Sequence, residues 1–176
     1  MEVEVAAEAE VDSLVVAAGS LAAVEALAAV EPEGAGNIMH PELFLSRLQH
    51  NEIVEAIHRA EQSSTGKIHV FVSHQIVGDA LTAARQRFET MKMHETHHHN
   101  GILIFVAPRS QSFAVVGDQA VHDRVGDAAW NQIASSMAHH FRDNQYTRGI
   151  VSAIQQLGDL LAAHFPRQAG ANQNPL

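Results

Sequence analysis

The chain has 176 residues, of which 46% are hydrophobic and 18% are charged, so it is long and apolar enough for one globular domain with a sizeable core. It contains no cysteine, which excludes disulfide bonds, thiolate zinc sites and cysteine nucleophiles. Its formal net charge is -9 at pH 7, from 20 Asp and Glu residues against 11 Lys and Arg residues.

Residues 1–37 are an acidic leader, rich in alanine and without Lys or Arg. Subtracting its 8 acids from the total of 20 leaves 12 acids against 11 bases in the rest of the chain. The acids of the leader are Glu2, Glu4, Glu8, Glu10, Asp12, Glu25, Glu31 and Glu33. A nearly neutral body with an acidic leader offers no basic stripe to a phosphate backbone, so we expect no nucleic-acid binding.

The same acids argue against a membrane segment in the leader. A secretory signal needs a positively charged start, and an acid at mid-membrane costs about 2.5 to 3.5 kcal/mol on insertion scales. We therefore expect a cytoplasmic protein with no transmembrane segment. Two interpretations of the leader stay open: a weakly ordered segment, or a lone docked helix from Leu14 to about Val30.

An α/β domain is predicted at residues 38–166, followed by a flexible tail at residues 167–176. From Pro41 to about Gln62, apolar residues recur at the spacing of one helix face. These residues are Leu45, Leu48, Ile53, Ile57 and Ala60. The turn-forming run Ser63-Ser64-Thr65-Gly66 should end this helix.

Three strands are predicted next. Lys67–Gln75 alternates as a half-buried strand does, and the continuous apolar run Gly101–Ala107 suits a central strand covered on both faces. A helix from Asp79 to about Lys92 should join these two strands, so they should be parallel. Ser112–Gly117 follows after a four-residue turn and must pair antiparallel with the second strand as a hairpin.

The rest of the domain is predicted to be helical, over about Gln119 to Arg124, Asp127 to Phe141 and Thr147 to Phe165. The expected fold class is therefore α/β. A small mixed sheet of three or four strands, with a parallel pair plus an antiparallel hairpin strand, is flanked by helices and followed by a helical C-terminal half.

A histidine-rich segment precedes the second strand, and His94-Glu95-Thr96-His97-His98 matches the zinc-protease pattern H-E-x-x-H. In a zinc protease this pattern lies inside a helix, whereas here Asn100-Gly101 ends the run and a strand follows. We therefore expect no zinc protease. An adventitious metal-binding cluster that includes His98 and His99, or a solvated polar turn, remain the alternatives.

The predicted topology gathers polar residues at one edge of the sheet, because the two parallel strands start there and the hairpin strand ends there. The residues expected to converge are Glu61, Thr65, His97, His98, His99, Asn100, Asp118, His122 and Asp123. Carboxylate oxygens favour Ca²⁺ or Mg²⁺, so the candidate metal ligands are Asp118, His122, Asp123 and Glu61. Asp118 and His122 are also the catalytic candidates.

These candidates have structural alternatives. Asp118 can equally cap the helix that follows it, since Gly-Asp before Gln-Ala-Val is an N-cap pattern. His122 and Asp123 fit a solvated helix surface. Asp79 fits a helix cap better than a metal ligand.

The motifs of the chain resemble those of the TPM domain family, in its short stand-alone bacterial version. The matching motifs are AEQSSTGKIHVFV at Ala60–Val72, HHHNGILIFVAPRSQSFAVVGD at His97–Asp118, VHDRVGDAAW at Val121–Trp130, and LAAHFP at Leu161–Pro166 with Asn172–Leu176. The resemblance implies helices flanking a small mixed sheet. The family is linked to acid-phosphatase activity with divalent cations in its chloroplast branch, and to the repair or assembly of membrane complexes, whereas most of its bacterial members have no assigned reaction.

Two departures from the family pattern bear on function. Lys67 stands where the family usually carries Glu, and His99 stands where it commonly carries Arg. Exchanging an anion for an ammonium changes the local charge by two units, and Lys67 could pair with Asp118 in place of a metal. We therefore expect Ca²⁺ or Mg²⁺ binding to be weakened or absent.

Two hypotheses of function follow. The first is a non-catalytic or weakly active interaction domain with a protein partner in an envelope-associated complex. The alternative is a divalent-cation-dependent, acid-phosphatase-like hydrolase in which Asp118, with His122 or Asp123, positions the cation and a water.

Overall fold

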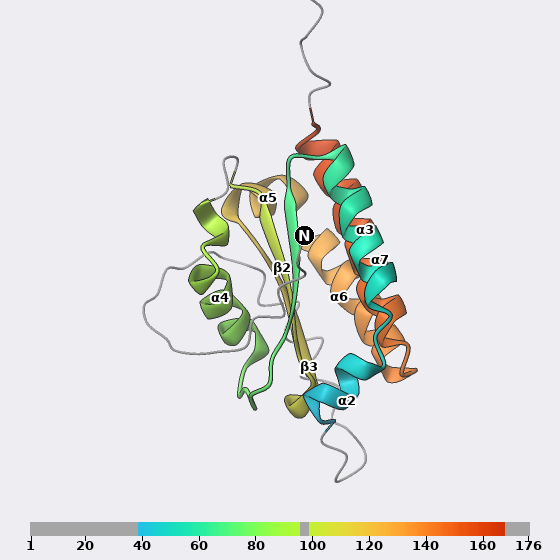
Figure 1. The fold of residues 1–176 in the computed structure, drawn as a ribbon. Helices are drawn as coiled ribbons and strands as arrows, with labels where there is room; N and C mark the ends of the chain where they lie inside the picture. Colours follow the sequence, from blue (N-terminus) through green and yellow to red (C-terminus); the bar gives the residue numbers. More distant parts are fainter. Residues whose placement is uncertain (1–38, 96–98, 168–176) are drawn as a thin grey trace, which may run out of the picture.

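A three-stranded sheet lies between two layers of helices in the computed structural model (Figure 1), which describes residues 39–95 and 99–167. The elements are α2 (Pro41–Ser46), α3 (His50–Ser63), β1 (Lys67–Val72), α4 (Ala80–Thr90), η1 (Met93–Glu95), β2 (Gly101–Ala107), η2 (Pro108–Ser110), β3 (Ser112–Gly117), α5 (Gln119–Val125), α6 (Asp127–Arg142) and α7 (Tyr146–His164). The interpretations of the leader, and of the tail beyond residue 167, lie outside the described residues.

The strand order is β1-β2-β3, with β2 in the centre. Strands β1 and β2 are parallel, with Lys67 opposite Gly101, and β3 returns antiparallel to β2, with Gly117 opposite Ile102. The predicted fold class is confirmed: a parallel pair plus an antiparallel hairpin strand, flanked by helices, with a helical C-terminal half.

The central strand β2 is buried along its whole length and separates two apolar cores. Ile102, Ile104 and Val106 face the core built with α3, α6 and α7. The intervening residues, Leu103 and Phe105 among them, face the smaller core against α4. Successive side chains of a strand point to opposite faces, so a run with no polar position is what a doubly covered strand requires.

The helix predicted from Pro41 to Gln62 is in fact two helices, α2 and α3, and this part of the prediction was wrong. The chain leaves the helical conformation at Gln49, where φ is -87° and ψ is 87°. There the Gln49 N–H donates to Thr147 Oγ1 at 3.0 Å, on the first turn of α7. Leu48 is buried all the same, so its apolar spacing did not reveal the break.

Helices α3 and α7 lie side by side on one face of the sheet (Figure 1) and approach closely at Gly158. A Cβ atom at Gly158 would lie 2.7 Å from Ala60 Cβ.

In the described part of the chain, no helix is both long enough and apolar enough to cross a membrane.

Gly158→Ala should therefore destabilise the domain, although alanine is the better helix former, because the two helices must separate to admit the methyl group. We expect a loss of about 1 to 3 kcal/mol in the free energy of unfolding, measured by urea denaturation. Gly78→Ala is the control, since a Cβ there meets nothing within 4 Å. Equal stability of the Gly158 variant and the parent would contradict the close approach.

Candidate functional site

Three segments meet at one edge of the sheet: the starts of β1 and β2, and the end of β3. The Asp118 N–H donates to the Gly101 carbonyl at 2.9 Å, and the Lys67 N–H donates to the Asn100 carbonyl at 3.3 Å. The buried Asn100 side chain donates to Thr65 Oγ1 at 2.9 Å. The hairpin therefore brings Thr65, Asn100 and Asp118 together at the predicted edge.

Asp118 is the most buried acid of this edge, with 9% of its surface exposed. Its Oδ1 accepts from the Gln119 N–H at 3.0 Å, so it caps α5. Its Oδ2 is buried and accepts no hydrogen bond from the described residues, and His99 Nδ1 lies 3.9 Å from it. Burial raises the pKa of Asp118; the Gln119 N–H and then the charges of His99 and His94 oppose that shift.

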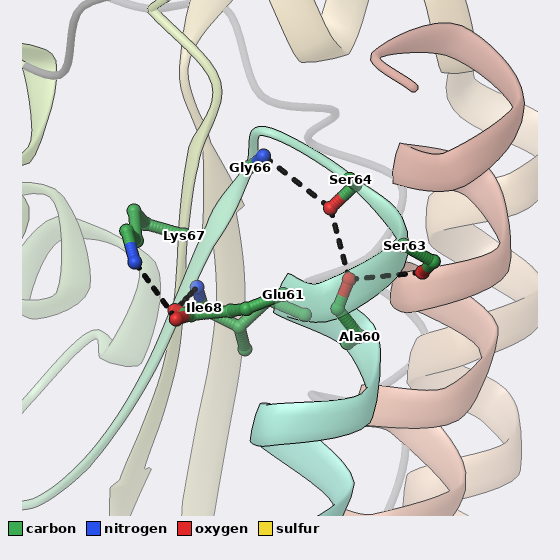
Figure 2. A network of polar contacts seen from close by, with 7 residues as sticks. All are labelled: Ala60, Glu61, Ser63, Ser64, Gly66, Lys67 and Ile68. Carbon is green, nitrogen blue, oxygen red and sulfur yellow. Dashed lines mark hydrogen bonds and ion pairs between the residues drawn. The ribbon is translucent and has the colours of Figure 1, made fainter. Parts of the chain in front are cut away.

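Lys67 pairs with Glu61, the last acid of α3 (Figure 2). Lys67 Nζ lies 2.8 Å from Glu61 Oε2, and Glu61 Oε1 accepts from the Ile68 N–H at 3.4 Å. The anticipated partner of Lys67 was Asp118, so the structure places this ammonium on a different carboxylate. Both side chains are partly exposed, and such a pair adds only about 0 to 1 kcal/mol to stability.

The turn between α3 and β1 holds this pair in place. The buried Ser64 hydroxyl donates to the Ala60 carbonyl at 3.0 Å and accepts from the Gly66 N–H at 3.3 Å (Figure 2). On the other side of the turn, the Thr65 N–H donates to the Phe165 carbonyl at 2.9 Å. The residue after α7 therefore anchors the Ser63–Gly66 turn. Two motifs that are distant in the sequence, this turn and the one around Phe165, thus meet at the same edge.

His122 and Asp123 lie on α5 and contact residues of α5 and of the start of α6. Asp123 is exposed, and its Oδ1 accepts from Gln119 Nε2 at 2.6 Å. The half-buried His122 has its Nε2 3.8 Å from Asp127 Oδ1, at the start of α6. Their assignment as metal or catalytic residues remains a prediction.

The described part of the histidine-rich segment does not continue as an α-helix. His94 lies in the one-turn 3-10 helix η1, and its Nδ1 is 3.1 Å from Glu89 Oε2. His97 and His98 lie outside the described residues. Within residues 39–95 and 99–167, no group of three or more His, Asp or Glu side chains is arranged to hold a metal ion.

Sequence reasoning missed two residues of this edge. Gln119 donates to both acids: its backbone N–H donates to Asp118 Oδ1, and its side-chain amide donates to Asp123 Oδ1. The charge of His94 lowers the pKa of Asp118, although His94 lies seven residues before the start of β2. The Gly-Asp-Gln start of α5 was a usable signal for Gln119, whereas the effect of His94 depends on how the loop folds back.

The fold is a small α/β domain, with a mixed three-stranded sheet between helical layers. At one end of the sheet, which we call the polar edge, the helix-capping Asp118 lies beside the Asn100-Gly101 start of β2. Residues 38–160 match the family model described as "TPM domain". This match covers well over half of the chain, and the chain belongs to the TPM domain family.

Solved structures resemble the chain, among them two NMR structures. The NMR structure of the BA42 protein from the psychrophilic bacterium Bizionia argentinensis is 31% identical, with a TM-score of 0.64, over 69% of this chain and 86% of that one. The solution NMR structure of the N-terminal domain of the cg2496 protein from Corynebacterium glutamicum is 14% identical, with a TM-score of 0.52, over 81% and 88% of the two chains. This second likeness concerns the fold alone. No curated protein matches the chain.

The pKa of Asp118 gives a direct test of the geometry at this edge. Replacing His99 with Gln removes a positive charge that lowers the pKa of Asp118, so that pKa should rise further above its usual value. NMR titration of the carboxyl carbon measures the shift. His74→Gln, at the far end of β1, should leave it unchanged. A pKa of Asp118 that is equal or lower in the His99 variant would show that the two side chains do not interact.

Proposed function

We propose that this chain is a non-catalytic or weakly active TPM-type interaction domain. The observation that carries the proposal is the ion pair between Lys67 and Glu61, whose Nζ and Oε2 atoms are 2.8 Å apart. Lys67 occupies a position where the family pattern has an acid. An ammonium there both repels a cation and satisfies the nearest carboxylate.

The other acids of the edge also have donors from their own chain. Asp118 accepts from the Gln119 N–H, and Asp123 accepts from the Gln119 side chain. A Ca²⁺ ion takes about 6 to 8 oxygen ligands. Recruiting Glu61 and Asp123 would cost the ion pair and the hydrogen bond that they already make, and Asp118 Oδ2 is only one further oxygen, which supports weak cation affinity.

Contact with a protein partner suits such an edge, because the rim of a protein–protein interface is polar and stays accessible to solvent. The proposal includes the setting expected from the sequence, an envelope-associated complex met from the cytoplasmic side. Fractionation of cells that make the protein would test this setting.

Lys67→Glu should restore divalent-cation affinity, because the substitution removes the ammonium and adds a second carboxylate beside Glu61. Isothermal titration with Ca²⁺ and Mg²⁺ should show binding to the variant that is at least about tenfold tighter, or about 1.4 kcal/mol. Zn²⁺, which we do not expect to bind at this edge, should show no comparable gain.

The matched control for this titration is Arg59→Glu. It breaks a similar ion pair, with Glu55 on the exposed face of α3, and changes the net charge by the same amount. A gain that is specific to Lys67→Glu supports the proposal. Parent affinity that equals or exceeds that of the Lys67 variant would refute it.

One observation favours the alternative, a divalent-cation-dependent, acid-phosphatase-like hydrolase. Asp118 is buried, its pKa is raised, and His99 lies 3.9 Å from its Oδ2. A raised pKa favours the protonated carboxyl group, which is the form that can act as a general acid toward a leaving oxygen. Lys67 would then supply positive charge for the developing phosphoryl charge.

Hydrolysis of 4-nitrophenyl phosphate between pH 5 and 7, with Mg²⁺ or Ca²⁺, separates the two functions. The interaction-domain proposal expects the parent rate to stay within about twofold of the blank, a negligible barrier reduction. A parent rate at least about tenfold above the blank that disappears in Asp118→Asn would establish the hydrolase. Asp79→Asn is the matched control, because Asp79 also caps a helix, α4, by accepting from the Thr82 N–H, and it is not one of the residues of this edge.

A further inference from the structure

Strand β1 is the outermost strand on one side of the sheet, and no other strand of residues 39–95 and 99–167 pairs with its outer side. We call this lateral side of the strand the β1 edge, as distinct from the polar edge at the strand ends. On the side of β2, the Lys67 N–H donates to the Asn100 carbonyl just before that strand at 3.3 Å, and the Ser73 N–H donates to the Val106 carbonyl at 2.7 Å. Because backbone groups alternate in direction along a strand, the N–H groups of Ile68, Val70 and Val72 point away from β2. An unpaired edge of this kind is a template for an added strand.

Glu61 already covers the first part of this edge, since its Oε1 accepts from the Ile68 N–H. Val70 and Val72 therefore present the next outward-pointing donors. Any strand that adds to β1 must bind there, beyond the turn that forms the candidate site.

The two faces beside this edge differ in character. On the side of α3, the half-buried Val70 packs on the larger core together with Ile57. On the side of α4, Lys67 and His69 are exposed, and the Arg87 guanidinium lies 4.0 Å from the centre of the Phe71 ring. An added strand would thus meet apolar neighbours on one face. On the other face it would meet Lys67 with its Glu61 partner, His69, whose pKa is lowered by desolvation, and the Arg87 guanidinium.

The start of the leader has the complementary pattern. Glu2–Val11 reads EVEVAAEAEV, in which acids and small apolar residues alternate with a period of two. The acids are Glu2, Glu4, Glu8 and Glu10, and the opposite face would carry Val3, Val5, Ala7, Ala9 and Val11. With one face apolar and one face acidic, this segment matches both sides of the β1 edge at once.

We propose that Glu2–Val11 of this chain binds the open edge of β1 as a fourth strand, paired with Val70 and Val72. The 27 residues from Asp12 to Ile38 reach about 90 Å when extended, which allows either strand direction. A second copy of β1 is the competing occupant. It would bring the Arg87 guanidinium of each copy to the same edge, whereas the leader brings carboxylates to the side of the edge that carries Arg87. The inference goes beyond the proposed function and does not depend on it.

Hydrogen exchange of the Val70 and Val72 amides, followed by NMR on the full chain, tests the pairing. The test variant is Val5→Pro with Ala6→Pro, which keeps the charge but removes two successive N–H donors. The matched control is Ala17→Pro with Ala18→Pro, in the leader but outside the proposed strand. Both amides should exchange at least about tenfold faster in the test variant than in the parent or the control.

Two further measurements keep the result decisive. The Leu103 amide, in the central strand, should stay protected in every variant, which separates strand release from unfolding. Raising the salt concentration should speed exchange at Val70 and Val72 in the parent, since charge attraction is screened. Equal exchange in parent and test variant would overturn the proposal. So would protection that rises with protein concentration in both, together with a doubled mass in light scattering, since a second copy would then cover the edge.

Discussion

The burial of β2 on both faces is the constraint on which the described structure depends. Each of its large apolar side chains contributes about 1.5 to 3 kcal/mol when fully buried, so neither face can be left to water. Helices α3, α6 and α7 cover one face and α4 covers the other. Strand β1 and strand β3 flank β2, which brings the start of one and the end of the other to the same edge.

The polar edge is a consequence of that arrangement rather than a cause of it. The exposed pair of Lys67 and Glu61 is worth at most about 1 kcal/mol, well below the contribution of one buried β2 side chain. Its charges are therefore free to vary without loss of the fold. That freedom explains how a member of the TPM domain family can carry a lysine beside Glu61 and keep the same sheet, with the consequences for cation affinity proposed above.

The outer edge of β1 differs in its chemistry from the polar edge. The polar edge is made of side chains from three segments, among which the Asn100 amide donates to Thr65 Oγ1. The β1 edge instead offers backbone donors, with a basic face on one side and an apolar face on the other. A single small domain thus presents two surfaces suited to different kinds of contact.

Periodicity and turn residues in the sequence were sufficient to determine the strands, their directions and the convergence at one edge, because β2 is apolar at every position and the four-residue turn after it permits only a hairpin. The sequence could not determine the break at Gln49, because Leu48 is buried whether or not the helix continues. Nor could it decide between Glu61 and Asp118 as the partner of Lys67. Only the tertiary structure made that choice, because the close packing of the Ser64 turn against the end of α7 sets where the Lys67 side chain can reach.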